Sequence, residues 1–377
     1  MSPFYNPSLS KLDLIRNVAF RSNTRLNRFS HSLSLLSNEN YKSIILPNNG
    51  DYLMRIFIGT PPIEKLAIFD PDTPLYDRTK SSAHTNLTCD TQSCTLLPKK
   101  QQFCGKSQEC FYSYHYGDKS FSVSELVVDS ISFGSNSVHI TFPKSIFGCG
   151  YYNIFTADNS GKAAGLVGLG AGPFSLVSQL GHSIGRKFSY CLVPFGSNST
   201  SKLKFGNQST ITGNEVVSTP LIIKSLEQTF YYLNLEGITI GRQKTIQTGQ
   251  IDGNIIIDSG TALMYLEQPF FDDFLASVKE VIDIEEVEDI PSPFHYCFED
   301  PNSSFPSIVL HFTGANVPLQ PKNILYLEEN NLVCLAVVPS NIAGISILGN
   351  LAQIDFQVEY DLEGKKLSFS PSDCTKN

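Results

Sequence analysis

The sequence predicts an all-β protein of two lobes. The chain has 377 residues, more than one hydrophobic core usually accommodates, so two lobes are expected. Its 26 Gly and 21 Pro divide the sequence into short apolar runs, and it is rich in Phe (26) and Tyr (16), a pattern typical of strands joined by turns. Because segments of helical periodicity are scarce, only a few short helices are expected.

Alternation of apolar and polar residues predicts the strands in chain order. It is clearest in YLMRIFIG (52–59) and recurs at 124–133, 138–150 and 230–241. A helix is predicted over 269–284, where Pro269 suits the first turn and Phe270, Phe274 and Val278 share one face. A shorter helix is predicted over 172–181, with Gly181 at its end.

A weak internal duplication indicates how the lobes are built. Residues 165–170 (GLVGLG) and 346–350 (SILGN) each join apolar residues to glycine. In the second half an acidic loop, IIIDSGTALMYL with Asp258, precedes this element. The matching position in the first half falls near residue 70. We therefore expect an N-terminal lobe over 46–187 and a C-terminal lobe over 188–377, each contributing one loop to a shared cleft.

The charge balance narrows the classes of partner. The formal net charge is -8 and the pI is about 5.4, which argues against a nucleic-acid or anionic-membrane partner. No apolar stretch approaches the roughly 18 residues that cross a bilayer. We expect no membrane and no nucleic-acid partner.

Residues 1–45 form a leader that differs in charge from the rest. They contain six Lys and Arg against Asp13 and Glu39, a net charge of +4. A basic amphipathic segment is typical of a solvated helix or of a prosegment that covers an acidic cleft, and both interpretations stay open. The leader has no apolar core of the kind that marks a signal peptide.

Cysteines and glycosylation sequons indicate an oxidising compartment. The cluster between Cys89 and Cys110 lacks the C-x-x-C pairs of a zinc site, so we interpret it as a disulfide framework. Nine cysteines are present, and an odd number leaves at least one without an intramolecular partner. We expect a secreted glycoprotein, although no signal peptide is evident. The four N-x-S/T sequons are at Asn86, Asn198, Asn207 and Asn302.

These segments resemble the pepsin-like aspartic proteases, most closely their plant secreted, nepenthesin-type branch. The resemblance covers nearly the whole chain, and its motifs follow one another in the order of the family. It implies a bilobal pepsin-like fold, cleavage of peptide or protein substrates at acidic pH, no metal or cofactor, and a monomer. The motifs are YLMRIFIGTPP, CFYSYHYGDKSFSVSELVVDS, IFGCG, AAGLVGLGAGPFSLVSQLG, KFSYCLVP, IIIDSGTALMYL and SILGNLAQIDFQVEYDLEGKKLSFSPSDC.

The resemblance assigns roles to residues of the second acidic loop and of a flap hairpin around 111–128. Asp258 matches the second catalytic aspartate. Ser259, Gly260 and Thr261 match the substrate-side positions after it, and Tyr116 matches the flap tyrosine that closes over the substrate. Two neighbouring aspartates share one proton, so the ionised one activates a water while the other donates to the peptide carbonyl.

The resemblance breaks where the first catalytic aspartate is expected. The family continues after KLAI with D-T-G-S, a Trp and several cysteines, whereas this chain continues with FDPDTPLYDRTKSS. Asp72 is the nearest substitute, but Pro74 replaces glycine and fixes φ near -65° without an N–H, and Leu75 replaces Ser or Thr. Asp70 is likewise followed by proline. We predict that some twenty-odd residues, including the first catalytic loop, are missing.

The cysteine pattern of the family fits this deletion. The branch usually has twelve cysteines, and the missing segment would contain three, one of them the partner of Cys149. Cys149 is therefore expected to be unpaired. The pairs implied by the resemblance are Cys89–Cys110, Cys94–Cys104, Cys191–Cys374 and Cys297–Cys334.

The sequence thus predicts an aspartic-type endopeptidase by family whose activity is impaired or lost in this chain. A non-catalytic binding protein on the same fold, such as an inhibitor of glycoside hydrolases, is the alternative. A third reading is that the gene encodes an ordinary protease and that this chain lacks the product of one exon.

Overall fold

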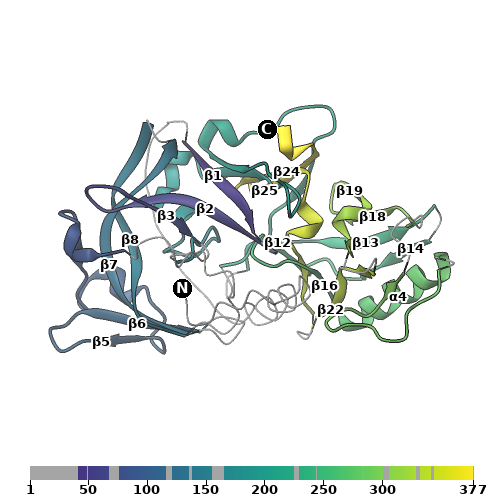
Figure 1. Cartoon of the computed structure of the whole chain (residues 1–377), viewed down its shortest axis with the longest axis horizontal. Coiled ribbons are helices and arrows are strands. Elements are labelled where there is room, and N and C mark those ends of the chain that lie inside the picture. The colour runs from purple at the N-terminus through teal and green to yellow at the C-terminus, as the bar shows by residue number, and fades with distance from the viewer. Residues whose placement is uncertain are drawn as a thin grey trace.

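The computed structural model describes residues 41–48, 50–67, 76–115, 121–135, 138–154, 165–224, 229–242, 244–282, 284–299, 305–327, 332–340 and 344–376. Strands dominate these residues and the helices are few and short, so the all-β prediction is confirmed. The strands of the first half lie at one end of an elongated molecule (Figure 1). Strands of the second half and its longest helix lie at the other end.

One large sheet joins the two halves of the chain. Its strands follow the order β11-β25-β24-β9-β10-β1-β2-β7-β6-β5, and β3, β4 and β8 pair beside this path. The C-terminal strand β24 thereby pairs with β9, and β25 pairs with β24 on its other side. The strands are β1 (Tyr41–Asn48), β2 (Asp51–Ile58), β3 (Ile63–Ala67), β4 (Thr85–Asn86), β5 (Gln102–Cys104), β6 (Cys110–His115), β7 (Phe121–Ser135), β8 (Val138–Ile154), β9 (Lys187–Cys191), β10 (Ser201–Phe205), β11 (Val217–Pro220), β24 (Phe356–Asp361) and β25 (Lys366–Pro371).

The expected leader overlaps this sheet. Residues 41–45 pair with β10, from Tyr41 opposite Phe205 to Ile45 opposite Ser201. Ser43 and Ile45 are buried, as expected for alternate residues on the inner face of a strand. Residues 41–45 are therefore part of the folded sheet, and residues 1–40 lie outside the described part of the chain.

The second half forms three smaller sheets. Their orders are β12-β15-β23-β16-β22, β14-β13-β18-β19 and β17-β21-β20. The first of them carries the Asp258 loop. Their strands are β12 (Tyr232–Leu233), β13 (Leu235–Ile240), β14 (Lys244–Gln247), β15 (Ile255–Ile257), β16 (Met264–Glu267), β17 (Cys297–Phe298), β18 (Ile308–Phe312), β19 (Ala315–Leu319), β20 (Leu325–Leu327), β21 (Val333–Leu335), β22 (Val337–Ser340) and β23 (Ser346–Leu348).

Helices form where the sequence predicts them, with shorter bounds. Helix α4 (Gln268–Val281) buries Phe270, Phe274 and Val278, and ends before residue 284 because Ile282 is extended. Helix α3 (Leu176–Leu180) begins late because Ser175 is its N-cap. The remaining short helices are α2 (Gln92–Thr95), η1 (Arg78–Lys80), η2 (Gly181–Ile184), η3 (Gly206–Ser209), η4 (Pro321–Asn323), η6 (Leu351–Gln353) and η7 (Cys374–Lys376).

Two disulfides stabilise the second half. Cys191 at the end of β9 bonds to Cys374 near the C-terminus, and Cys297 of β17 bonds to Cys334 of β21, as the resemblance implies. Cys149 in β8 is a free thiol, as expected.

The disulfides of the first half correct the expected pairing. Cys89 bonds to Cys104 and Cys94 bonds to Cys110, so the pairs Cys89–Cys110 and Cys94–Cys104 are wrong. The reason is burial. Cys94 of α2 and Cys110 of β6 are fully buried in one small core with Leu97 and Leu126, whereas Cys104 is exposed.

Candidate functional site

The loop of Asp258 follows a buried strand of three isoleucines. Strand β15 lies parallel to β23, with Ile257 opposite Leu348. The N–H of Asp258 then donates to the carbonyl of Leu348 at 3.1 Å, which extends the pairing by one residue. The aspartate is thereby fixed at the end of a rigid, fully buried strand.

Hydrogen bonds from its own loop orient the carboxylate of Asp258. The N–H of Gly260 donates to Oδ1 at 2.9 Å, and the hydroxyl of Thr261 donates to Oδ2 at 2.6 Å. Thr261 is fully buried, so its hydroxyl is held in place by packing. Three predicted site residues, Asp258, Gly260 and Thr261, are therefore brought together.

Strand β23 crosses closely behind this loop. A Cβ on Gly349 would lie 2.1 Å from the carbonyl oxygen of Leu263 and 2.6 Å from that of Ala262, so only glycine fits there. Asn350 follows, with its side-chain amide donating to the carbonyls of Ser259 at 3.0 Å and Gly50 at 3.1 Å. Asn350 thus ties the Asp258 loop to the turn between β1 and β2.

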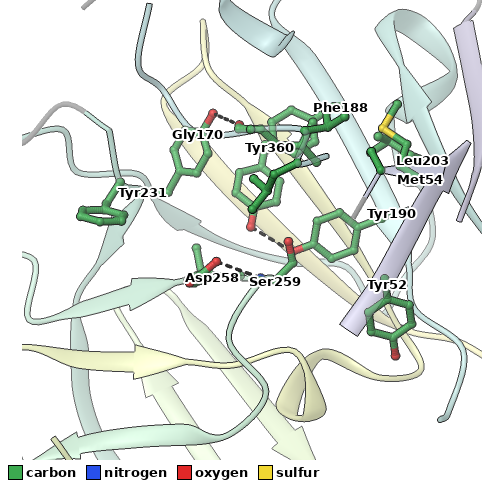
Figure 2. Close-up of a pocket in the computed structure, with 18 of the residues that line it drawn as sticks. Tyr52, Met54, Gly170, Phe188, Tyr190, Leu203, Tyr231, Asp258, Ser259 and Tyr360 are labelled. Atoms are coloured by element: carbon green, nitrogen blue, oxygen red, sulfur yellow. Dashed lines mark hydrogen bonds between the residues drawn. The ribbon is translucent and has the colours of Figure 1, made fainter. Parts of the chain in front are cut away.

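A cavity of about 240 Å³ opens beside Asp258. Its walls come from the large sheet, from 166–170 and from the Asp258 loop (Figure 2). The apolar wall is formed by strands of the large sheet and by Leu192, which follows β9. It includes Ile45, Met54, Ala67, Leu192 and Leu203.

Aromatic side chains fill the space between this wall and Asp258. The hydroxyl of Tyr190 lies 2.9 Å from that of Tyr360 and donates to Oε1 of Gln353 at 2.5 Å. The ring of Phe188 stacks on Tyr360 at 4.3 Å between centroids, and Tyr231 lies 4.9 Å from Tyr360. Both Tyr190 and Tyr360 point toward Asp258 and Ser259 (Figure 2).

Burial moves the pKa values of the Tyr190 and Tyr360 phenols further above physiological pH. It raises the pKa of Tyr190, although the hydrogen bonds with Tyr360 and Ser259 act in the opposite direction, and the negative charge of Asp258 raises it further. Burial also raises the pKa of Tyr360 well above its ordinary value. The aromatic wall therefore carries hydroxyl groups but no charge at physiological pH.

Asp258 is the only carboxylate among the described residues that line the cavity. Asp70 and Asp72, the candidates for the first aspartate, lie outside the described residues, as do Pro74 and Leu75. Tyr116 also lies outside them. Its two flanking strands are described, and β6 pairs with β7 up to His115 opposite Phe121, so a flap-like hairpin is present.

The duplicated elements of the two halves differ in their packing. In the second half, Ile347 and Leu348 are 1% exposed and Gly349 packs against backbone. In the first half, Leu166 is 46% exposed, and a Cβ on Gly168 would meet nothing within 4 Å. Among the described residues, no segment packs against Gly168 as the backbone of 262–263 packs against Gly349.

The aromatic wall of the site was not among the predicted site residues. Phe188 and Tyr190 alternate in KFSYC, so a shared face was predictable, and Tyr360 follows the same period in FQVEYD. That this face borders Asp258 depends on the pairing of β9 with β24, which joins segments about 170 residues apart. Only the folded chain reveals it.

Cys149 lies apart from the cavity, opposite Glu125 in the pairing of β8 with β7. Burial raises the pKa of its thiol, and the nearby Arg78 lowers it by less. Three sequon asparagines, Asn86, Asn198 and Asn207, are exposed, and Asn302 lies outside the described residues.

Within the described ranges, no three His, Cys, Asp or Glu side chains are arranged to bind a metal ion. The same ranges contain no helix that is long and apolar enough to cross a membrane.

Family models match both halves of the chain. Residues 52–207 match a model described as the N-terminal part of xylanase inhibitors, and residues 230–371 match the corresponding C-terminal part.

Curated relatives match over the full length. A probable aspartic protease of Arabidopsis thaliana is 38% identical over 418 aligned positions, covering 100% of this chain and 92% of the relative. The aspartic proteinase nepenthesin-2 of Nepenthes gracilis is 34% identical, covering 97% of this chain and 87% of the relative.

Solved structures share the fold at low identity. Basic 7S globulin from soybean superposes with a TM-score of 0.74 at 18% identity, covering 89% of this chain and 98% of the globulin. Conglutin gamma from lupine seeds superposes with a TM-score of 0.75 at 18% identity, covering 90% and 98%.

Proposed function

Because this chain belongs to the plant pepsin-like aspartic protease family, we propose that it is an aspartic endopeptidase by descent whose catalytic centre is incomplete. It keeps the second aspartate loop and lacks the first. The family acts on peptides and proteins, so a peptide or protein is the substrate class that the cleft would accept.

The packing of the first duplicated element carries this proposal. A Cβ on Gly349 would meet the backbone of 262–263, the segment that leads from the Asp258 loop into β16, whereas a Cβ on Gly168 would meet no described residue within 4 Å. An intact first loop would continue into a strand that crosses Gly168 in the same way. The exposure of Leu166 at 46%, against 1% for its counterpart Ile347, supports the absence of that strand.

Two further observations agree with a deletion. The alignment with the Arabidopsis relative has 418 positions, 41 more than the 377 residues of this chain, so the relative contains segments that this chain lacks. The thiol of Cys149 is free, as a chain without its partner cysteine requires.

The chemical consequence follows from the sharing of one proton. In a pair, the ionised aspartate takes a proton from water while the protonated one donates to the peptide carbonyl. With Asp258 alone, one carboxyl would have to serve as base and acid toward a water held on one side only. Loss of one member of a catalytic unit commonly costs about 10⁴-fold or more in rate.

The test is hydrolysis of an acid-denatured protein by the chain refolded under oxidising conditions, at about pH 3–4, where family dyads hold a single proton. We expect turnover at least about 10⁴-fold below that of nepenthesin-2 and no difference between the chain and its Asp258→Ala variant. Turnover that a transition-state-mimic peptide inhibits and that Asp258→Ala abolishes would contradict the proposal. In that case another carboxylate, Asp72 first among the candidates, completes the pair.

A second candidate is a binding protein that inhibits a glycoside hydrolase. The match of both halves to xylanase-inhibitor models favours it, and so does the fold shared with seed globulins. Inhibition of a plant-pathogen xylanase by the refolded chain, measured as reducing-sugar release, tests this candidate. Full xylanase activity at micromolar concentrations of a cooperatively folded chain would exclude that enzyme as a target.

The proposal also covers the location, oligomeric state and glycosylation of the protein. Four disulfides fit an oxidising compartment, so we place the protein outside the cell as a glycosylated monomer. The exposed Asn86, Asn198 and Asn207 are the sites proposed for glycans, with Asn302 as a fourth. We also propose that Tyr116 and Ser259 lie on the substrate side of the cleft.

A further inference from the structure

We propose that a second cavity, separate from the one beside Asp258, binds a neutral sugar through two adjacent hydroxyl groups of its ring. This cavity lies where the start of β24, the end of β25 and η4 come together. Its volume is about 440 Å³, and pockets for small ligands begin at about 300 Å³. The two cavities share no described lining residue, so the proposal is independent of the proposed loss of hydrolysis.

A hydrogen-bond donor and an acceptor lie side by side in the lining of this second cavity. Nζ of Lys322 pairs with Oδ2 of Asp355, and the N–H of Cys374 donates to Oδ1 at 2.9 Å. Each carboxylate oxygen accepts two hydrogen bonds and an ammonium group donates three, so both side chains keep capacity for a ligand. Two adjacent hydroxyls of a sugar ring match this pair, because one accepts from the ammonium group while the other donates to the carboxylate.

The lining carries charged groups in pairs. Besides Lys322 and Asp355, the charged residue among the described lining residues is Asp373, whose carboxylate lies 2.7 Å from Nζ of Lys376. A charged ligand would therefore face one group of its own sign in each pair, whereas a neutral polyol can bind donor and acceptor alike. Gln320, exposed at the rim, adds a side-chain amide whose N–H groups have no partner in the described part of the chain.

Apolar groups complete the lining. Pro318 and Pro371 are exposed, and Phe356 and Ile354 are buried among the lining residues. A pyranose ring has hydroxyls at its rim and C–H groups on its faces. The C–H groups can pack against the proline rings, which removes apolar surface from water.

The backbone holds the central carboxylate in place. Asp355 has a φ of 57°, in the left-handed region that residues other than glycine seldom adopt, and residues held in this way cluster at ligand-binding sites. Its N–H donates to the carbonyl of Leu192 at 3.0 Å, and its carbonyl accepts from the N–H of Ser372 at 2.9 Å. The acceptor is thus preorganised, which lowers the entropic cost of binding.

The probe is cellobiose, added to the refolded full chain at neutral pH and observed by saturation-transfer difference NMR. We expect binding in the millimolar range, because each sugar hydroxyl gives up a hydrogen bond to water when it binds. The control ligand is tetrahydropyran-4-ol, which has a similar ring and a single hydroxyl, and it should bind at least about tenfold more weakly. Equal affinities, or no saturation transfer to cellobiose or mannobiose at 20-fold excess, would overturn the proposal.

A second sugar distinguishes two sources of the ligand. α-1,2-Mannobiose represents the glycans of glycoproteins, and cellobiose represents β-linked glucans. Both sugars offer adjacent hydroxyls. Tighter binding of cellobiose would support the cavity as a site for free or polymeric glucan, and tighter binding of mannobiose would support it as a site for a protein-linked glycan.

Two variants locate the site. Lys322→Met keeps a long side chain and removes the ammonium group, so it should weaken cellobiose binding about tenfold. Gln320→Ala removes the rim amide and should also weaken it. The matched control is Lys244→Met, which breaks the exposed ion pair with Glu280 outside the cavity and should leave the affinity unchanged.

Thermal melting of each variant separates a folding defect from a lost contact. Unchanged cellobiose binding in folded Lys322→Met and Gln320→Ala variants would place the sugar elsewhere and refute the assignment. Failure of this inference leaves the proposed loss of hydrolysis untouched, since the latter is measured with a protein substrate at a different site.

Discussion

Gly349 and Gly168 occupy equivalent positions of the two duplicated elements and meet different surroundings. A methyl group at 349 would collide with the carbonyl oxygens of Leu263 and Ala262, which belong to the backbone and cannot move alone. A methyl group at 168 would collide with nothing within 4 Å. Since the two residues are chemically identical, the difference lies in the chain that passes them.

This contrast makes a prediction for two alanine variants. Gly349→Ala should lower the free energy of unfolding by about 1–3 kcal/mol, the usual cost of overpacking. Gly168→Ala should change it by no more than about 0.5 kcal/mol. Urea denaturation of both refolded variants measures the two values. A comparable loss for Gly168→Ala would mean that a segment does pack over it, contrary to the proposed deletion.

At the scale of elements, an ion pair links β9 to β24 where the two halves meet. Nζ of Lys187 lies 2.8 Å from Oδ2 of Asp361, its cross-strand partner. Burial raises the pKa of Asp361, but the hydrogen bonds from Lys187 and from the N–H of Gly364 outweigh it and hold the pKa below 3.8. The hydrogen bond to Asp361 raises the pKa of Lys187 above 10.5, although burial lowers it.

These directions set the pH window of the pair. Because the carboxyl pKa is lower in the folded state, its contribution is complete above about pH 3.8 and is lost as the pH falls through the folded-state value. Because the ammonium pKa is raised, its contribution is complete below about pH 10.5 and is lost as the pH rises further. Lys187→Met should therefore destabilise the fold by about 1 kcal/mol at neutral pH.

Denaturation of Lys187→Met from neutral to acidic pH provides the measurement. The difference in free energy of unfolding between Lys187→Met and the unaltered chain should shrink as the carboxyl of Asp361 is protonated. Lys202→Met, an exposed lysine on the neighbouring strand β10, is the control and should show no such window. A difference that is constant with pH would assign the effect to lost packing.

The disulfides of the first half are a second feature at this scale. Peptide mapping without reduction should recover Cys89 linked to Cys104 and Cys94 linked to Cys110. Cys149 should be the single alkylated thiol in denaturant and should react slowly in the folded chain, because burial raises its pKa. Recovery of the nested pairs Cys89–Cys110 and Cys94–Cys104 would contradict the structure.

At the scale of the whole molecule, the proposed loss of the first catalytic loop predicts that activity can be restored. Replacing residues 68–75 by the segment that nepenthesin-2 carries between its corresponding strands should restore the two-aspartate centre. Hydrolysis at acidic pH should then rise by about 10⁴-fold, because both members of the catalytic unit are present. Turnover of the graft and of the graft with Asp258→Ala, each assayed with a transition-state-mimic inhibitor, measures this.

The activity of the graft also shows whether the rest of the chain can support catalysis. A graft that is active only with Asp258 intact would mean that the second lobe is a competent half of a protease. A folded graft without activity would contradict the view that the loop alone is missing.

The sequence by itself determined the fold class, the family and the Asp258 loop. Alternating strands, ordered motifs and the residues D-S-G-T are patterns of residues that are close in sequence. Such patterns can be recognised in the sequence alone. Helix positions followed for the same reason, with α4 ending three residues earlier than predicted because Ile282 leaves the helical conformation.

Only the tertiary structure decided which distant residues meet. The sequence placed four cysteines between residues 89 and 110, but burial of Cys94 with Cys110 selected their pairing. Likewise, the block of Phe188, Tyr190, Tyr231 and Tyr360 beside Asp258 exists because β9 and β24 pair across the chain. Contacts of this kind depend on the register and crossing of strands far apart in sequence, which residue spacing does not encode.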